Sequence, residues 1–189
     1  MSTTRAELAE QIEKAANEAF ANGALITRWR SEGRGATTRF VKEIFGDLGK
    51  RLGFQVAANR RHYRNADEGE FLYDMVWYTL DRLDRGMLIQ QAMTLESELR
   101  PGEGNVETAA DVDRDFQKLA QARADVRVWV NVCPNADLLE RHLANCKRQA
   151  TLFGGAEDGD SYVLIGSEWN TSTSKIERLE VSRRDAASA

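Results

Sequence analysis

Three strand-like runs follow one another near the middle of the chain, and they constrain its fold more than any other feature. They are "FQVAANR" at 54–60, "EFLYDMVWYTL" at 70–80 and "MLIQQAMTLESEL" at 87–99, and they contain many β-branched and aromatic residues. The segment "DRLDRG" joins the last two runs and has the composition of a turn. Together the three runs predict a β-meander.

Two helices are expected before this meander. Residues 3–23 begin with two threonines and predict the first helix, and residues 36–53 predict the second. We expect Thr37 or Thr38 to cap the second helix and Gly53 to end it. The meander therefore follows directly on a helix.

After the meander, helical and strand-like segments alternate. Residues 106–125 predict a helix with acidic residues in its first turns, and the apolar segment 126–132 predicts a strand. Residues 135–154 predict a helix opened by Asn135, and residues 161–184 predict a β-hairpin. The fold class expected from this order is α/β.

The chain has the composition of a single globular domain. It has 189 residues, of which 42% are hydrophobic and 30% are charged. We expect one domain over residues 1–185 and a disordered tail at 186–189. No apolar stretch is long enough to cross a bilayer and the first residues lack the apolar core of a signal peptide, so we expect a cytoplasmic protein that does not bind membranes. Cys133 and Cys146 are expected to be buried free thiols, because no CxxC motif accompanies them.

Charge is unevenly distributed along the chain, although the net charge is only −4. Residues 1–65 hold 12 Lys and Arg against 7 Asp and Glu, whereas residues 66–125 hold 6 against 14. This difference is compatible with ordinary surface charge. It also suits a metal site flanked by arginines that bind phosphate groups.

Carboxylates are the main candidates for site residues. The chain has only two histidines, and it lacks the HExxH, GxSxG and phosphate-loop motifs. Asp74 lies in the middle of an apolar run, and Glu96 and Glu98 lie two residues apart at the end of the next, so they share one face of a strand. These acids could converge on a site of hard oxygen ligands suited to Mg²⁺ or Mn²⁺. They could also face a basic side chain, or lie in solvent at the rim of the sheet.

The arrangement of these residues resembles a known family. A helix, three strands, a helix and a strand follow in order, with Asp74 on the second strand and Glu96 near the end of the third. This order resembles the PD-(D/E)xK nucleases, the restriction-endonuclease-like superfamily, which includes uncharacterised bacterial proteins. The family's motif has a lysine two residues after the Glu, where this chain has Glu98. In some members that lysine is moved to the following helix, where this chain has Lys118.

The resemblance, which spans about residues 38–132, implies a fold. We expect a restriction-endonuclease-like αβββαβ core, with a central mixed sheet flanked by helices. The first helix of the chain, the last helix and the β-hairpin would be additions to this core.

The resemblance also implies roles for particular residues. Asp74, Glu96 and Glu98 would bind Mg²⁺ or Mn²⁺, with Glu98 as a third ligand or as a base, and Lys118 would position the attacking water. Glu43 is the expected helix acid that contacts the metal through water. Lys118 and Glu43 are also compatible with ordinary exposed helix positions, Glu43 with a salt bridge to a neighbour such as Arg39.

Arginines near the start of the second helix and after the first strand could bind phosphates. They include Arg34, Arg39, Arg60, Arg61 and Arg64, with His62 and Tyr63 between them for base stacking. As surface charge these arginines would need no explanation.

Two functions from different classes are open at this stage. The first is a divalent-metal-dependent nuclease in defence or repair that hydrolyses phosphodiester bonds of nucleic acid, with DNA favoured over RNA. The second is a catalytically inactive protein of the same fold that binds nucleic acid or a protein partner, which the missing ExK lysine favours. A carboxylate-pair hydrolase acting on sugars is a weaker third alternative. A second copy of the chain is also open as a partner.

Overall fold

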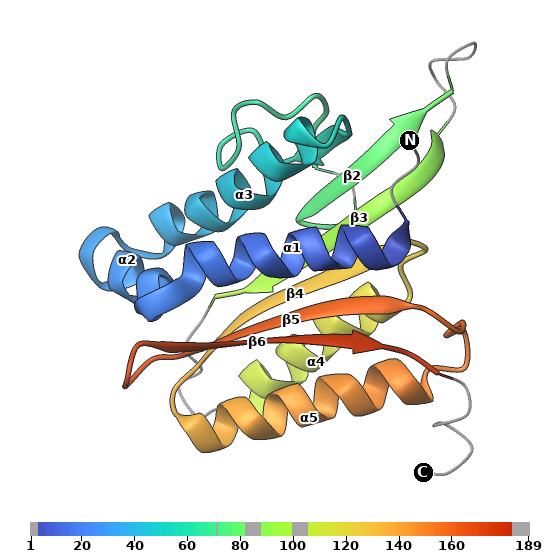
Figure 1. Cartoon of the computed structure of the whole chain (residues 1–189). Helices are drawn as coiled ribbons and strands as arrows, with labels where there is room; N and C mark the ends of the chain where they lie inside the picture. Colours follow the sequence, from blue (N-terminus) through green and yellow to red (C-terminus); the bar gives the residue numbers. More distant parts are fainter. Residues whose placement is uncertain (1–3, 71, 82–87, 100–105, 183–189) are drawn as a thin grey trace.

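The computed structural model describes residues 4–70, 72–81, 88–99 and 106–182 (Figure 1). The elements in chain order are α1 (Arg5–Phe20), the 3₁₀ turn η1 (Ala21–Gly23), α2 (Ala24–Glu32), α3 (Arg34–Arg51), β1 (Gln55–Ala58), β2 (Met75–Leu80), β3 (Leu88–Glu98), α4 (Val106–Ala120), β4 (Val126–Cys133), α5 (Ala136–Leu152), β5 (Ser161–Glu168) and β6 (Thr173–Glu180). The expected tail at 186–189 and most of the turn at 81–86 lie outside the described residues.

All six strands form one mixed sheet, in the spatial order β1-β2-β3-β4-β5-β6. Strands β1, β2 and β3 pair antiparallel, so the predicted meander is confirmed. Strand β4 is parallel to both β3 and β5, and β5 and β6 form the predicted antiparallel hairpin. The two parallel connections contain α4 and α5, because a parallel crossover needs a long connection.

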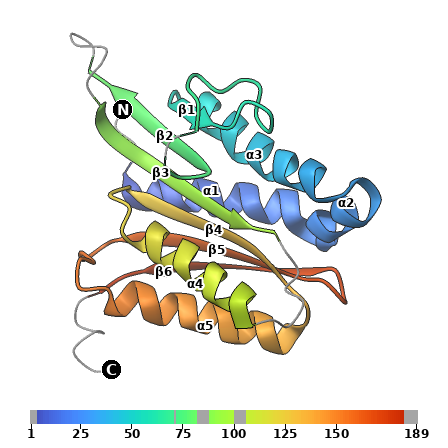
Figure 2. The ribbon, with the colours of Figure 1, turned by 180° about the vertical axis from the view of Figure 1, so that it is seen from behind.

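Helices cover both faces of the sheet. Helices α1 and α3, with α2 beside them, lie on one face, and α4 and α5 lie on the other (Figures 1 and 2). The α/β class, with a mixed sheet flanked by helices, is therefore as expected. Among the described residues, no helix is long and apolar enough to cross a membrane.

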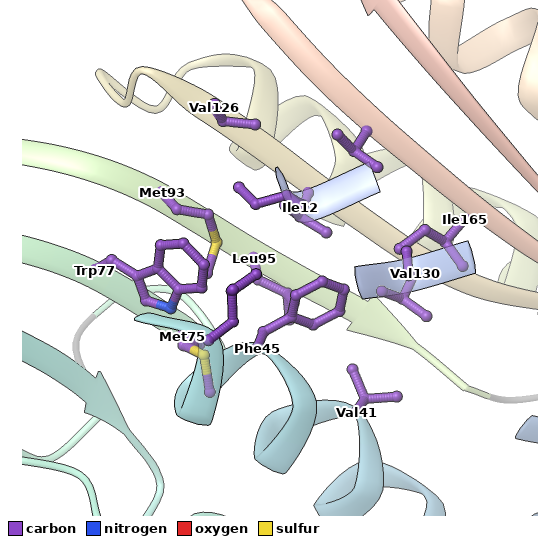
Figure 3. Close-up of a cluster of buried hydrophobic side chains, with 14 of the residues drawn as sticks. Ile12, Val41, Phe45, Met75, Trp77, Met93, Leu95, Val126, Val130 and Ile165 are labelled. Atoms are coloured by element: carbon purple, nitrogen blue, oxygen red, sulfur yellow. The ribbon is translucent and has the colours of Figure 1, made fainter. Parts of the chain in front are cut away.

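The larger core lies between the sheet and helices α1 and α3. Figure 3 shows Ile12 and Phe45 from these helices packed against Trp77, Met93 and Leu95 from the strands. All five side chains are fully buried, so burial of apolar surface holds this helix layer on the sheet.

A smaller core lies under α4 and α5. It contains Phe116, Trp129 and Tyr162, together with the two cysteines, Cys133 and Cys146, which are buried and free as predicted. Alternate residues of β3 and β4 therefore face different helix layers, which matters for the candidate site.

The helix ends before the meander differ from the prediction. Helix α2 was not anticipated as a separate element. Helix α3 begins after Gly33 (φ +83°), and Thr37 and Thr38 lie inside it, each donating its hydroxyl to the carbonyl four residues earlier. The predicted threonine caps were therefore wrong, because the glycine, which tolerates positive φ, turns the chain earlier. Gly53 (φ +86°) follows the end of α3, as predicted.

The second strand is shorter than predicted. It was expected to begin at residue 70, but β2 begins at Met75, so Asp74 precedes the strand rather than lying in its middle. Met75 is the last paired residue on both sides of β2, opposite Ala58 of β1 and Leu95 of β3. The backbone bends at 72–74 instead.

Candidate active site

The carboxylate of Asp74 is held by three hydrogen-bond donors. Ser97 of β3 donates to Oδ2 from its backbone N–H at 2.9 Å and from its hydroxyl at 2.7 Å. The ammonium of Lys42, on α3, donates to Oδ1 at 3.3 Å. A carboxylate offers about four lone-pair positions. Asp74 is thus fixed in orientation, with acceptor capacity left on Oδ1.

Lys42 is the residue of this site that the sequence analysis missed. Its side chain is only 1% exposed, and its Nζ lies 3.2 Å from Glu70 Oε1 as well as 3.3 Å from Asp74 Oδ1. The sequence did contain a signal for it. Lys42 falls on the helical stripe of Val41 and Phe45, and a cation on a buried stripe requires a negative partner.

Glu43, the acid expected to reach the metal through water, is exposed on α3. The buried stripe of α3 includes Val41, Lys42 and Phe45, and Glu43 lies outside it. Helix α3 therefore brings a lysine to Asp74, and the position chosen from the sequence was one residue away from it.

Glu96 pairs with Lys118 on the face of the sheet that α4 and α5 cover. Leu95 faces the core under α1 and α3, so its neighbour Glu96 points to the layer of α4 and α5. The Lys118 ammonium, in the last turn of α4, lies 2.6 Å from Glu96 Oε1, and the Glu96 side chain is only 7% exposed. The lysine that the resemblance assigned to the following helix thus contacts the glutamate assigned to the third strand.

Burial controls the protonation of this pair. Burial, helped by the nearby Asp74 charge and only partly opposed by the contact with Lys118, raises the pKa of Glu96 to about 7. For Lys118, burial lowers the pKa, but the contact with Glu96 and the charges of Asp115 and Asp74 outweigh burial and raise it above its ordinary value. Lys118 therefore stays a cation, whereas Glu96 exchanges its proton near neutral pH.

The remaining acids lie close to this pair. Glu98 is buried and lies two residues after Glu96 in β3, so both side chains project from the same face. Asp115 lies on α4, three residues before Lys118, and its charge acts on Glu96 and Lys118. Lys118 contacts Glu96, the charge of Asp74 acts on both of them, and Glu98 projects from the same strand face as Glu96.

All five of the predicted phosphate-binding arginines are exposed: Arg34, Arg39, Arg60, Arg61 and Arg64. Arg60 donates to the backbone carbonyl of Asp67 at 2.8 Å. His62 is half-buried. Burial and the charge of Lys42 lower the pKa of its imidazole, whereas the charges of Glu70 and Asp74 act in the opposite direction.

Tyr63 was expected to stack on bases, and this was wrong. Its side chain is buried, and its hydroxyl donates to Asp47 at 3.1 Å. The ring packs over Gly46, where a Cβ would lie 2.4 Å from it. Tyr63 instead anchors the loop between β1 and β2 on helix α3.

The acids near β2 and β3 do not form a complete metal-binding cage. Among the described residues, no group of three or more His, Cys, Asp or Glu side chains is arranged to hold a metal ion. Mg²⁺ is usually bound by one or two carboxylates, with water and substrate phosphates completing its shell. Asp74 and Glu96 are two carboxylates whose charges interact, and each has a lysine partner already: Lys42 for Asp74 and Lys118 for Glu96.

No protein-family model matches the chain, and neither the curated proteins nor the solved structures give a significant match. The candidate site is therefore defined by its own geometry. Two acids lie at the junction of β2 and β3, and each is paired with a lysine from a different helix layer.

Proposed function

We propose that this chain is a divalent-metal-dependent nuclease on a restriction-endonuclease-like scaffold, hydrolysing phosphodiester bonds of nucleic acid, with DNA as the favoured substrate. The ion pair between Lys118 and Glu96 is the observation that carries the proposal. This pair links the glutamate near the end of β3 to the lysine of the following helix, which is the pairing that the resemblance implies. The expected cytoplasmic location is part of the same proposal.

The order of elements supports the scaffold. Helix α3 is followed by the meander β1-β2-β3, then by α4 and the parallel strand β4, which is the αβββαβ order expected from the resemblance. Helix α1, helix α5 and the β5-β6 hairpin extend this core. Asp74 lies at the start of β2 rather than within it, but still beside the end of β3, through Ser97.

The residues of the site have distinct roles in this mechanism. Asp74 and Glu96 would hold one Mg²⁺ or Mn²⁺, with Glu98 as a further acid on the same strand face. When bound, the ion supplies Lewis-acid polarisation of the phosphodiester and lowers the pKa of a bound water. Ser97 and Lys42 fix the Asp74 carboxylate in one orientation before substrate binds.

Lys118 acts as a hydrogen-bond donor in this mechanism. Its raised pKa keeps it protonated, so it cannot accept the proton of the attacking water. It can donate from Nζ to that water or to a phosphate oxygen, where negative charge increases as the reaction proceeds. Its ammonium also lies 5.7 Å from the centre of the Tyr73 ring, which limits its motion on that side.

The test is cleavage of duplex DNA, single-stranded DNA and RNA in the presence of Mg²⁺, Mn²⁺ or EDTA. The wild type is compared with Asp74→Asn and Lys118→Met, and Gln117→Ala, an exposed neighbour on α4, is the matched control. We expect metal-dependent cleavage that falls by about 100-fold or more in the two site variants, the usual cost of losing one stabilising group. Thermal unfolding and circular dichroism show that each variant is folded.

Two results would overturn the proposal. Full activity in Asp74→Asn would show that the acid pair does not bind the catalytic ion. If the folded wild type cleaves none of the substrates and binds no Mn²⁺, the inactive alternative is favoured. In that reading, the two lysines permanently neutralise the acids and the scaffold binds a partner.

A further inference from the structure

His142, on α5, is tied to the sheet by a hydrogen bond that depends on its protonation state. The indole N–H of Trp129, on β4, donates to His142 Nε2 at 2.9 Å. Trp129 is fully buried, whereas His142 is half-buried. An indole N–H can only donate, so Nε2 must be the unprotonated nitrogen of the imidazole. The neutral ring therefore has its proton on Nδ1.

The thiol of Cys146 lies beside the same nitrogen. Its Sγ is 3.3 Å from His142 Nε2, one turn along α5. Burial raises the pKa of this thiol and of the Cys133 thiol on β4, so both are neutral. Cys146 is also fully buried, so this Cys–His pair lacks the accessible thiolate that a catalytic pair needs. The thiol instead places a second donor group beside Nε2.

A proton on Nε2 would remove the acceptor that holds the indole. The imidazolium would present an N–H to the indole N–H at the same short distance, and the buried indole would lose its hydrogen-bond partner. Apolar side chains such as Leu139 and Leu143 would then hold α5 on the smaller core. Protonation of His142 therefore weakens the docking of α5 on β4.

The surroundings of His142 oppose its protonation. Burial lowers the pKa of the imidazole from 6.5, and among the described residues the charge of Asp113, on α4, acts in the opposite direction. The Asp113 carboxylate accepts hydrogen bonds from Asn145 at 2.9 Å and Gln149 at 3.4 Å, both on α5. The docked helix thus binds this proton less tightly than a released helix would, so acid favours release.

We propose that His142 is a pH-sensitive latch, which fastens α5 to β4 through the Trp129 indole while the imidazole is neutral and releases it on protonation. The latch is independent of the proposed nuclease activity. It acts below about pH 6.5, where a released imidazole takes up a proton and the docked one resists it. Between these two pKa values, the released fraction should rise by up to about tenfold per pH unit.

The first test follows the imidazole and the indole by nitrogen–proton NMR of the full chain between about pH 8 and about pH 5. The chain has two histidines, so His62→Gln identifies the signals of His142. We expect the neutral His142 ring to carry its proton on Nδ1, and a titration midpoint below 6.5 that also shifts the Trp129 indole signal. A midpoint at or above 6.5, or a neutral ring protonated on Nε2, would overturn the proposal.

The second test measures release itself, by solvent exchange of the indole proton. Trp77, which is equally buried but lies in the larger core, is the internal reference that cancels the effect of pH on the exchange reaction. We expect the ratio of Trp129 exchange to Trp77 exchange to rise as the pH falls, in the wild type and in the control His62→Gln. In His142→Gln the amide oxygen can accept from the indole but takes up no proton, so the ratio should stay constant.

Two results of the exchange test would overturn the latch. A constant ratio in the wild type would show that protonation leaves α5 docked. A His142→Gln variant that kept the full wild-type rise would show that the response comes from another group. If His142→Gln does not fold, the wild-type ratio and the imidazole titration still decide.

Discussion

Glu96 should make the stability of the metal-free protein depend on pH, and Glu96→Gln should remove that dependence. The pKa of Glu96 is raised by burial from 4.5 to about 7 in the folded chain. The folded state therefore holds this proton more tightly than the unfolded state does. The stability that results is fully present below about pH 4.5 and is lost as the pH rises through about 7.

The magnitude follows from the shift. A rise from 4.5 to about 7, at about 1.4 kcal/mol per pKa unit, corresponds to about 3 kcal/mol of unfolding free energy. A glutamine at this position has no proton to lose. The stability of Glu96→Gln relative to wild type should therefore increase by about 3 kcal/mol between about pH 4 and about pH 8.5.

The assay is urea unfolding of both proteins at several pH values, with EDTA present so that the proton is the only cation that binds Glu96. Taking the difference between the proteins cancels the other titrating groups. Glu43→Gln, which removes one exposed negative charge, shows how much of the effect comes from net charge alone. A Glu96→Gln difference that stayed constant within about 0.5 kcal/mol would refute the reasoning that burial dominates this carboxyl.

Two further predictions concern stability. Gly46→Ala should destabilise the fold by about 1–3 kcal/mol, since its Cβ would lie 2.4 Å from the buried Tyr63 ring. Gly35→Ala, the control, has open space around the new Cβ and should be neutral or stabilising. Equal losses of stability in the two variants, measured by thermal unfolding, would contradict this prediction. Asp160→Ala should lower the free energy of unfolding by about 3–5 kcal/mol, because it leaves Arg127 without the buried carboxylate 3.1 Å away. A decrease below about 1 kcal/mol, measured by urea unfolding, would show that this ion pair contributes little to stability.

Local sequence patterns predicted the order of the elements, apart from α2, and several of their ends. Alternating and apolar runs correctly indicated the meander, the strand β4 and the final hairpin. Asn135 was correctly chosen as the cap of α5, where its side chain accepts from the N–H of Leu138 at 3.0 Å. These features depend on contacts between residues close in sequence, so the sequence alone contains them.

Sequence also pointed to Asp74, Glu96 and Lys118 as one group. Asp74 and Glu96 are charged residues within apolar runs. Lys118 is the one lysine of the sequence between Lys50 and Lys147. The pairing of Glu96 with Lys118 links residues from a strand and the following helix, which sequence order makes neighbours. The resemblance supplied the reason to connect them.

Only the tertiary structure decided which partners the acids have. Lys42 reaches Asp74 from 32 residues away, and Glu70 joins it because the loop after β1 is anchored by Tyr63 on α3. The shift of Glu96's pKa likewise depends on how deeply α4 buries it. Burial and long-range charge contacts arise only when the layers pack, so no local pattern can specify them, whereas helices and strands follow from residues close in sequence.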